Sequence, residues 1–172
     1  MTIFETPRLM FRHLELADFD DLYRLYGDIE IRRYFPDGVR SAEQTREELE
    51  YFRKGHPRDP RLGLWAAIEK ASGKFVGRCG LLPWEIDGVL EIEIAYMIDK
   101  SRWREGFGSE SANGLVEYAF SQLGLSKVIA LIDPEHDASI RTAKRAGLSF
   151  EKEIWMDCLA SVVYSRTRQK VA

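Results

Sequence analysis

Cysteine is scarce in this sequence, and no hydrophobic run is long enough to span a membrane. The 172 residues include two cysteines, Cys79 and Cys158, which lie far apart and lack the close spacing of a zinc site. Their scarcity predicts a reducing compartment, the cytoplasm, and no bound metal, with a disulfide between them as the less favoured alternative. Charges interrupt every apolar group in residues 1–15, so we expect no secretory signal.

An excess of charge of one sign is also missing. The formal net charge is −3 and the pI is about 5.7, which argues against nucleic acid as the main partner. The lack of a membrane-length run argues against a membrane partner in the same way. Hydrophobic residues make up 45% of the chain, enough for one core, so residues 1–172 are expected to form a single domain.

The two common nucleotide-binding motifs are absent. No Gly-x-x-x-x-Gly-Lys-Ser/Thr sequence occurs, which excludes a P-loop. A dinucleotide fold would need a third glycine at position 111, where the chain has Ser111. These absences leave other phosphate-binding arrangements open.

Hydrophobic periodicity predicts seven strands and four helices. Asp18 and Ser41 are the expected N-caps of the first two helices. The strands are expected at 9–16, 64–70, 74–86, 89–98, 127–132, 148–155 and 160–168, and the helices at 17–28, 42–54, 107–123 and 137–147. This order predicts an α/β fold with a mixed sheet: three antiparallel strands, then a parallel pair connected through the helix at 107–123.

Two glycines lie where the clearest expected strand, at 89–98, is followed by the clearest expected amphipathic helix, at 107–123. Gly106 and Gly108 open the helix at 107–123, where the first N–H groups lack intrahelical partners and carry partial positive charge. Glycine lets a phosphate approach such a backbone closely, and Arg102 and Arg104 could reach the same anion. The alternative is a glycine turn with two solvated arginines.

Three stretches together resemble the GCN5-related N-acetyltransferases (GNAT). They are "FETPRLMFRHLELADFDDLYRLYGD", "YMIDKSRWREGFGSESANGLVEYAF" and "LSKVIALIDPEHDASIRTAKRAGLSF", and the resemblance covers roughly residues 5–168. More narrowly, the chain is similar to the branch that acetylates N-termini of ribosomal proteins and small amines. The resemblance implies a mostly antiparallel seven-stranded sheet, splayed between the family's strands 4 and 5 and flanked by about four helices. It also implies acetyl transfer from acetyl-CoA to a primary amine by direct attack in a ternary complex.

The resemblance assigns the coenzyme A contacts. Gly106 and Gly108 match the glycines of the family's acyl-CoA signature, Trp103 takes its first position, and His136 stands where the family has asparagine. Lys144 occupies the position of the family's general-acid tyrosine, so no residue at that position is assigned the role of general acid. The implied coenzyme-binding residues are Tyr96, Met97 and Ile98 for pantetheine, Trp103, Arg104, Glu105, Gly106, Phe107, Gly108 and Ser109 for the pyrophosphate, and His136 and Ser139.

The chemistry of acyl transfer suggests further residues. The amine must lose a proton, and Glu93 is the candidate base, acting through a water; Glu91 on the same strand face would raise its pKa. A solvated strand face is the alternative for both. Ser139 is the candidate to hydrogen-bond the departing thiolate, or else a serine that satisfies its helix's first turn. Backbone N–H groups at 96–98 would hold the oxyanion. The candidate acceptor pocket comprises Tyr34, Phe35, Trp84 and Glu91.

Two alternatives stay open from the sequence. The acceptor is either a protein N-terminus or a small-molecule amine. A non-catalytic acyl-CoA-binding or regulatory domain is the rival class, favoured by His136 and Lys144. A homodimer is a further alternative, with the strand at 159–167 as the edge that would pair.

Overall fold

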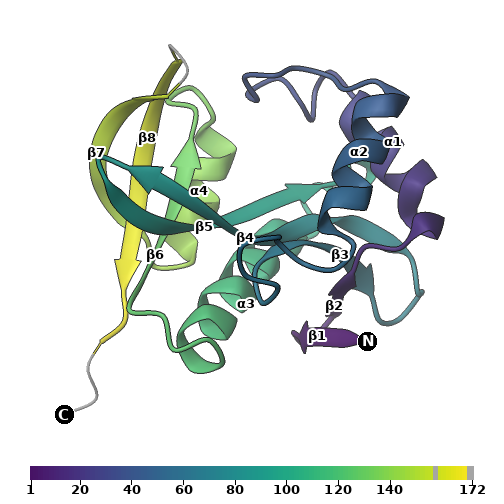
Figure 1. Ribbon diagram of the computed structural model, residues 1–172, viewed down its shortest axis with the longest axis horizontal. Helices are drawn as coiled ribbons and strands as arrows, with labels where there is room; N and C mark the ends of the chain where they lie inside the picture. The colour runs from purple at the N-terminus through teal and green to yellow at the C-terminus, as the bar shows by residue number, and fades with distance from the viewer. Residues whose placement is uncertain (157–158, 170–172) are drawn as a thin grey trace.

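A computed structural model describes residues 1–156 and 159–169 of the chain, in which eight strands form one sheet (Figure 1). The strands are β1 (Thr2–Glu5), β2 (Leu9–His13), β3 (Gly63–Glu69), β4 (Phe75–Ile86), β5 (Val89–Ile98), β6 (Lys127–Ile132), β7 (Ser149–Met156) and β8 (Leu159–Thr167). The helices are α1 (Phe19–Gly27), α2 (Ala42–Phe52), α3 (Phe107–Ser121) and α4 (Asp137–Arg145), with short 3₁₀ turns at η1 (Leu16–Asp18) and η2 (Lys100–Arg102).

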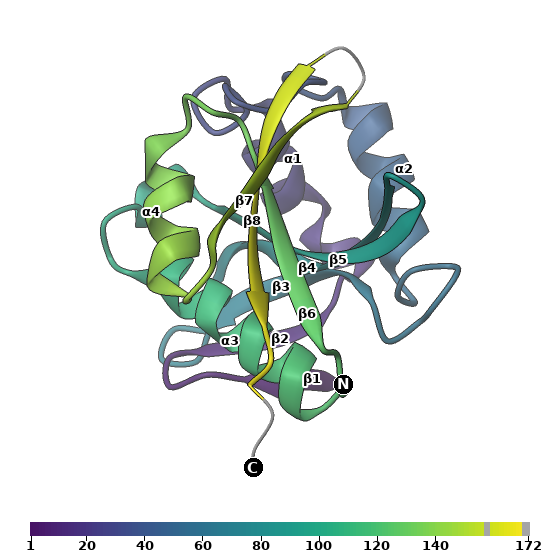
Figure 2. The same ribbon diagram turned by 90° about the vertical axis from the view of Figure 1, so that its left-hand side faces the viewer.

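The sheet is mixed, as the sequence predicts. Strands β1 to β5 pair antiparallel in chain order, β5 pairs parallel to β6 across the α3 connection, and β8 lies between β6 and β7. The sheet has eight strands rather than seven because Thr2–Glu5 adds an antiparallel strand to β2. Figure 2 shows β6, β7 and β8 running across the direction of β3, β4 and β5, so the sheet twists strongly along its width.

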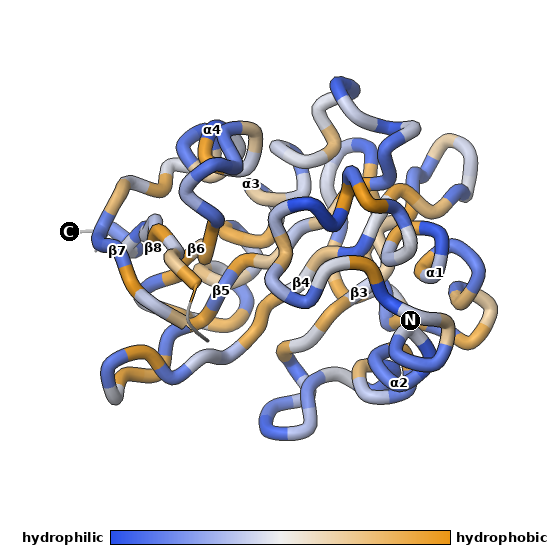
Figure 3. The backbone as a smooth tube through the Cα atoms, turned by 90° about the horizontal axis from the view of Figure 1, so that it is seen from above, coloured by the Kyte–Doolittle hydropathy of each residue, from blue (hydrophilic) through white to orange (hydrophobic). Residues whose placement is uncertain are grey.

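Helices cover both faces of the sheet (Figures 1 and 3). Alternation along β5 divides its side chains between two hydrophobic clusters. Ile94 and Ile98 join the cluster that contains residues of α3 and α4, whereas Ala95 and Met97 join the cluster that contains residues of α1 and α2. Glu93 is in step with Ala95 and Met97, so its side chain lies on the α1 and α2 face.

One of the two expected helix caps is present. Ser41 caps α2: its hydroxyl accepts a hydrogen bond from the Gln44 N–H at 3.2 Å. The expectation for Asp18 is wrong, because its helical backbone angles (φ −82°, ψ −2°) do not suit a capping residue. Its buried carboxylate instead accepts hydrogen bonds from Arg12 at 2.7 and 2.8 Å and from the Glu15 N–H at 2.7 Å.

The expectation of an exposed edge at 159–167 is also wrong. Strand β8 forms ladders with β6 on one side and β7 on the other, so β7 is the outermost strand at this end. Cys79 is a buried free thiol in β4, while Cys158 lies outside the described residues. Within the described ranges, no helix combines the length and hydropathy needed to cross a membrane.

Candidate functional site

The sheet opens between β5 and β6. Glu93 and Ile129 form the one register pair of this parallel ladder among the described residues. Beyond Glu93, the backbone of Tyr96, Met97 and Ile98 stays paired with β4, but it has no ladder partner in β6. Apart from the Ile98 carbonyl, which accepts a hydrogen bond from Trp103, the edge of β5 that faces β6 is therefore available to an extended ligand, at the place where the resemblance puts pantetheine.

The chain turns sharply into α3 just after this open edge. Arg104 and Gly106 both have positive φ angles, 68° and 84°, and Gly106 is the N-cap of the helix. The first helical bond runs from the Glu110 N–H to the Gly106 carbonyl at 3.0 Å. The N–H groups of Phe107, Gly108 and Ser109 thus have no partner within the helix, which makes this end suited to an anion.

Gly108 is not required by the protein's own packing. Its φ is not positive, and an added Cβ would meet Ile98 Cγ1 at 3.8 Å, an ordinary van der Waals contact. A side chain there would instead cover the N-terminus of α3. The glycine therefore leaves room for a ligand close to the backbone, as a coenzyme A diphosphate would need.

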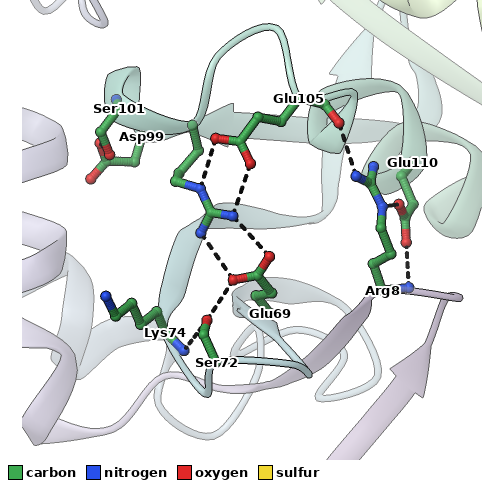
Figure 4. Close-up of polar contacts among 9 residues, drawn as sticks. Arg8, Glu69, Ser72, Lys74, Asp99, Ser101, Glu105 and Glu110 are labelled. Atoms are coloured by element: carbon green, nitrogen blue, oxygen red, sulfur yellow. Dashed lines mark hydrogen bonds and ion pairs between the residues drawn. The ribbon is translucent and has the colours of Figure 1, made fainter.

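Ion pairs hold the same helix end in place (Figure 4). Arg102 donates to the carboxylates of Glu69 at 2.8 Å and Glu105 at 3.0 Å, so the expectation that it reaches a bound anion is wrong. Arg8 donates to the Glu110 carboxylate at 2.6 Å and to the Glu105 carbonyl at 2.9 Å. Arg104 is exposed and forms no ion pair within the described residues, so it is the basic side chain left for a ligand.

Two aromatic residues of the turn have structural partners. The buried Phe107 ring lies between the guanidinium carbons of Arg8 and Arg102, at 4.3 and 4.7 Å from its centroid. Only the backbone of Phe107 is therefore placed to meet a ligand. The Trp103 indole N–H donates to the Ile98 carbonyl at 2.9 Å, which ties the turn to the end of β5.

Glu93 lies beside the opening with a perturbed carboxyl group. Trp84 donates its indole N–H to Glu93 Oε2 at 2.6 Å, and burial raises the pKa of Glu93 to about 7 despite some remaining exposure. The smaller effects of Trp84, Arg78 and the Leu131 N–H all favour the carboxylate. A carboxyl group that titrates near neutral pH can accept a proton from an amine.

Glu91 has a different role from the expected one. Its carboxylate accepts from Lys127 Nζ at 2.6 Å, and the same ammonium contacts Glu151 at 3.0 Å. Glu91 is absent from the causes of the Glu93 pKa shift, so the expected like-charge mechanism is wrong and burial replaces it. The ion pair joins β5 to β6 and β7 at the closed end of the ladder.

Ser139 and Tyr96 meet across the opening. The Tyr96 hydroxyl is 3.1 Å from Ser139 Oγ and donates to the Ser139 carbonyl, also at 3.1 Å. Burial raises the pKa of Tyr96 above its ordinary value, so the phenol keeps its proton. The family resemblance implies only a backbone role for Tyr96; in the structure its side chain adds a hydroxyl donor beside Ser139.

Tyr34 and His136 stack on one another, with ring centroids 4.3 Å apart and planes 16° from parallel. Tyr34 belongs to the connection between α1 and α2, and His136 precedes α4. Burial lowers the pKa of His136, which favours the neutral imidazole. Phe35 instead packs with the α1 and α2 cluster, with the Arg32 guanidinium carbon 4.5 Å from its ring.

Sequence reasoning missed Arg78, which lies buried on the same sheet face as Glu93. The available signal was a single charged residue within the apolar strand "FVGRCGLL". No group of three or more histidine, cysteine, aspartate or glutamate side chains in the described part of the chain could hold a metal ion. The arrangement combines an anion cradle, an open strand edge, a carboxyl base and a hydroxyl pair.

Comparison with protein families finds one domain family over most of the chain. The acetyltransferase (GNAT) domain matches residues 8–149. The protein named YkkB of Bacillus subtilis (strain 168), which is uncharacterized, is 33% identical over 164 residues, covering 94% of this chain and 93% of that protein. An uncharacterized N-acetyltransferase of Bacillus licheniformis, p20, is 28% identical over 149 residues, covering 86% of this chain and 82% of p20.

Solved structures share the fold at low sequence identity. An acetyltransferase of the GNAT family from Bacillus anthracis aligns with a TM-score of 0.81 at 22% identity, over 97% of this chain and 98% of that one. RimL, a ribosomal L7/L12 N-acetyltransferase solved with coenzyme A, aligns with a TM-score of 0.77 at 17% identity. The alignment covers 97% of this chain and 98% of RimL. The aminoglycoside acetyltransferase AAC(6')-Ib, solved with coenzyme A, aligns with a TM-score of 0.75 at 17% identity. The alignment covers 93% of this chain and 95% of that chain.

Proposed function

Because the chain belongs to the GNAT acetyltransferase family, and is therefore an acyltransferase with acetyl-CoA as co-substrate, we propose that it acetylates a primary amine. The amine attacks the thioester directly while both substrates are bound. The acceptor is the N-terminus of a protein or a small molecule; RimL and AAC(6')-Ib, named above, represent these two kinds among proteins of the same fold.

The observation that carries the proposal is the position and acidity of Glu93. It is the last residue of β5 that pairs with β6, so it stands where the open edge begins. Its pKa of about 7 lets the carboxylate take a proton at neutral pH and release it again. A proton acceptor next to a coenzyme cradle is what amine acetylation requires.

The other residues follow from the same geometry. The N–H groups of residues 107–109 hold the diphosphate, and the edge at 96–98 binds the pantetheine and supplies an N–H donor to the developing oxyanion. Glu93 removes the amine proton through a water. Ser139, hydrogen-bonded to the protonated Tyr96 phenol, donates to the departing thiolate.

Replacing Glu93 by glutamine tests the proposal. Thiol release from acetyl-CoA in the presence of a panel of amines should fall about 100-fold in turnover, since positioned bases contribute 10²–10⁴-fold. Acetyl-CoA affinity should stay the same because the carboxyl group lies outside the cradle. Asp87→Asn, in the turn between β4 and β5, is the matched control and should keep full turnover. Undiminished turnover in Glu93→Gln would rule out the base.

The pH dependence gives an independent reading of the same group. Only the carboxylate accepts a proton, so wild-type kcat/KM should show a limb that rises through about pH 7, followed at higher pH by the rise that deprotonation of the acceptor amine produces. In Glu93→Gln this limb should disappear and leave the titration of the acceptor amine alone. A wild-type profile without a limb near pH 7 would contradict the assignment.

A further inference from the structure

Three arginines surround one buried tyrosine on the α1 and α2 face of the sheet. The guanidinium carbons of Arg32, Arg40 and Arg78 lie 5.4, 5.5 and 5.4 Å from the centroid of the Tyr26 ring. Tyr26 belongs to α1, Arg32 and Arg40 to the connection that follows it, and Arg78 to β4. We call Arg32, Arg40 and Arg78 the arginine cluster.

Two carboxylates neutralise two members of the arginine cluster. Arg40 donates to Glu48 of α2 at 2.5 Å and to Asp37 at 2.7 Å. Arg32 donates to Asp37 and, at 2.7 Å, to the Gly38 carbonyl. Glu48 also accepts from the Tyr26 hydroxyl. Both carboxylates are therefore already held by Arg32 and Arg40.

Arg78 is left without a carboxylate. It is 6% exposed, and its Nε donates to the Tyr26 hydroxyl at 2.8 Å. In the described part of the chain, neither Nη1 nor Nη2 makes a hydrogen bond and Arg78 enters no salt bridge. A guanidinium cannot lose its charge. The carboxylates of Glu48 and Glu93 act on Arg78 from a distance, but no carboxylate among the described residues contacts it directly to offset its burial. Two parallel N–H donors thus remain free for an anion from outside the protein.

Arg78 and Glu93 occupy the same face of two paired strands. Arg78 is opposite Met97, and Glu93 is opposite Leu82. Between these two levels, the residues that face each other are Gly80 and Ala95, so no larger side chain of β4 or β5 separates Arg78 from Glu93. Met97, opposite Arg78, is four residues from Glu93, which corresponds to roughly 13 Å along β5. Because both side chains are long, the distance between the guanidinium and the carboxyl group can be shorter than the distance between the backbones. The charge of Arg78 also reaches Glu93.

We propose that the acceptor carries an anionic group, a carboxylate, that binds Nη1 and Nη2 of Arg78 while its amine faces Glu93. This inference rests on the proposed function and names the class of its acceptor: an amino acid or a short peptide with an acidic group. A polycationic amine would leave Arg78 unpaired and would add positive charge beside the arginine cluster.

Matched acceptor pairs test the inference in the unmodified protein. Amino acids are offered as free carboxylates and as carboxamides, and short peptides with a free N-terminus are offered with aspartate or asparagine at the second position. Thiol release should be at least 10-fold faster in kcat/KM for the acidic member of a pair. If free amino acids react faster than their carboxamides, the group that binds Arg78 is the α-carboxylate. If peptides with aspartate react faster than those with asparagine, that group is a side-chain carboxylate. Equal rates, or faster rates with carboxamides or polyamines, would overturn the inference.

Variants locate the effect at Arg78. Arg78→Gln should lower kcat/KM for the acidic acceptor roughly 10- to 100-fold, since charged hydrogen bonds contribute about 1.5–3 kcal/mol. The same variant should leave acetyl-CoA binding unaffected. It should lower kcat/KM less for the neutral acceptor than for the acidic one, because only the acidic acceptor loses its contact with Arg78, whereas both experience the change in charge near Glu93. Arg53→Gln, which removes an exposed guanidinium paired with Glu50 on α2, should keep the preference. A preference that survives in a folded Arg78→Gln protein would overturn the assignment.

A binding measurement separates this inference from the proposed function. If no amine is turned over, N-acetylglycine and N-acetylglycinamide are titrated into the protein saturated with coenzyme A. Selective binding of the acid, lost in Arg78→Gln and kept in Arg53→Gln, would support the anion site although the enzyme assignment had failed. Equal or absent binding of both compounds would overturn the anion site itself.

Discussion

Ionisation of the Glu93 carboxyl group, which is partly buried, lowers the stability of the folded protein. Burial raises its pKa from 4.5 to about 7, which means that the folded protein holds the proton more tightly than the unfolded chain does. The stability that this proton provides is complete below pH 4.5 and is lost as the pH rises through about 7. The residue that we propose as the base thus weakens the fold at the pH at which a base would be ionised.

Glu93→Gln should therefore be more stable than the wild type at pH 8, with a smaller difference at pH 5. The change in the difference should be on the order of 1–2 kcal/mol. Urea unfolding at both pH values measures it. Glu91→Gln is the control: it breaks the ion pair with Lys127 and should not stabilise the protein at either pH. A Glu93→Gln difference that does not change with pH would contradict the pKa shift.

The two glycines of the cradle differ in what they do. Gly106 has a φ of 84°, and the turn requires a glycine there. At Gly108 φ is not positive and an added Cβ would make only ordinary contacts, so the fold does not require a glycine at that position. Gly106→Ala should cost about 1 kcal/mol of folding stability, because a Cβ is strained in the left-handed region. Gly108→Ala should be neutral or stabilising by about 0.5–1 kcal/mol in the free protein. Thermal unfolding of both variants compares them; destabilisation by Gly108→Ala would give that glycine a structural purpose.

At the scale of elements, hydrogen bonds between Tyr96 and Ser139 connect β5 to α4 across the opening. Tyr96 of β5 reaches the hydroxyl and the carbonyl of Ser139 in the first turn of α4. Packing of α4 on α3 and β6 places the helix, and the hydroxyl contacts add a direct connection to β5. Under the proposed mechanism, a small displacement of α4 would move the Ser139 hydroxyl away from the leaving thiolate.

Two conservative variants separate the structural and chemical parts of this contact. Tyr96→Phe removes both hydrogen bonds and should cost about 1 kcal/mol of stability. Ser139→Ala keeps the hydrogen bond from the Tyr96 hydroxyl to the carbonyl of residue 139 and should cost less stability. It should lower turnover more, because Ser139 is the residue that we propose to meet the thiolate. Urea unfolding and thiol release are measured on both. The reverse order of turnover would move the donor role to Tyr96.

The long elements are predictable from sequence because their patterns are local. The alternation in β5 and the amphipathic pattern of α3 depend on neighbours within a few residues. Strand β1 has four residues, too few for alternation to appear, and its existence depends on pairing with β2. Its position before a helical pattern predicts that Asp18 is a cap, but its contact with Arg12 depends on how η1 turns.

At the scale of the whole molecule, the chain brings two distant segments together over the opening. The connection after α1 supplies Tyr34, and the segment before α4 supplies His136; their rings stack. Glu93 lies on a strand between these segments in sequence. The sequence could propose Glu93 and Ser139 as candidates through the family resemblance. It could not predict the Tyr34–His136 contact or the buried position of Arg78, because both depend on how the helices pack on the sheet.

The most direct test of the account is calorimetric titration of acetyl-CoA. The wild type should bind with micromolar affinity, Gly108→Trp should lose binding because the indole covers the N-terminus of α3, and Asn113→Trp, at an exposed position of the same helix, should retain it. This outcome would establish the cradle on which the acetyl transfer depends. A folded wild type that gives no heat with acetyl-CoA would contradict the account and leave Gly106 and Gly108 as the residues of a turn.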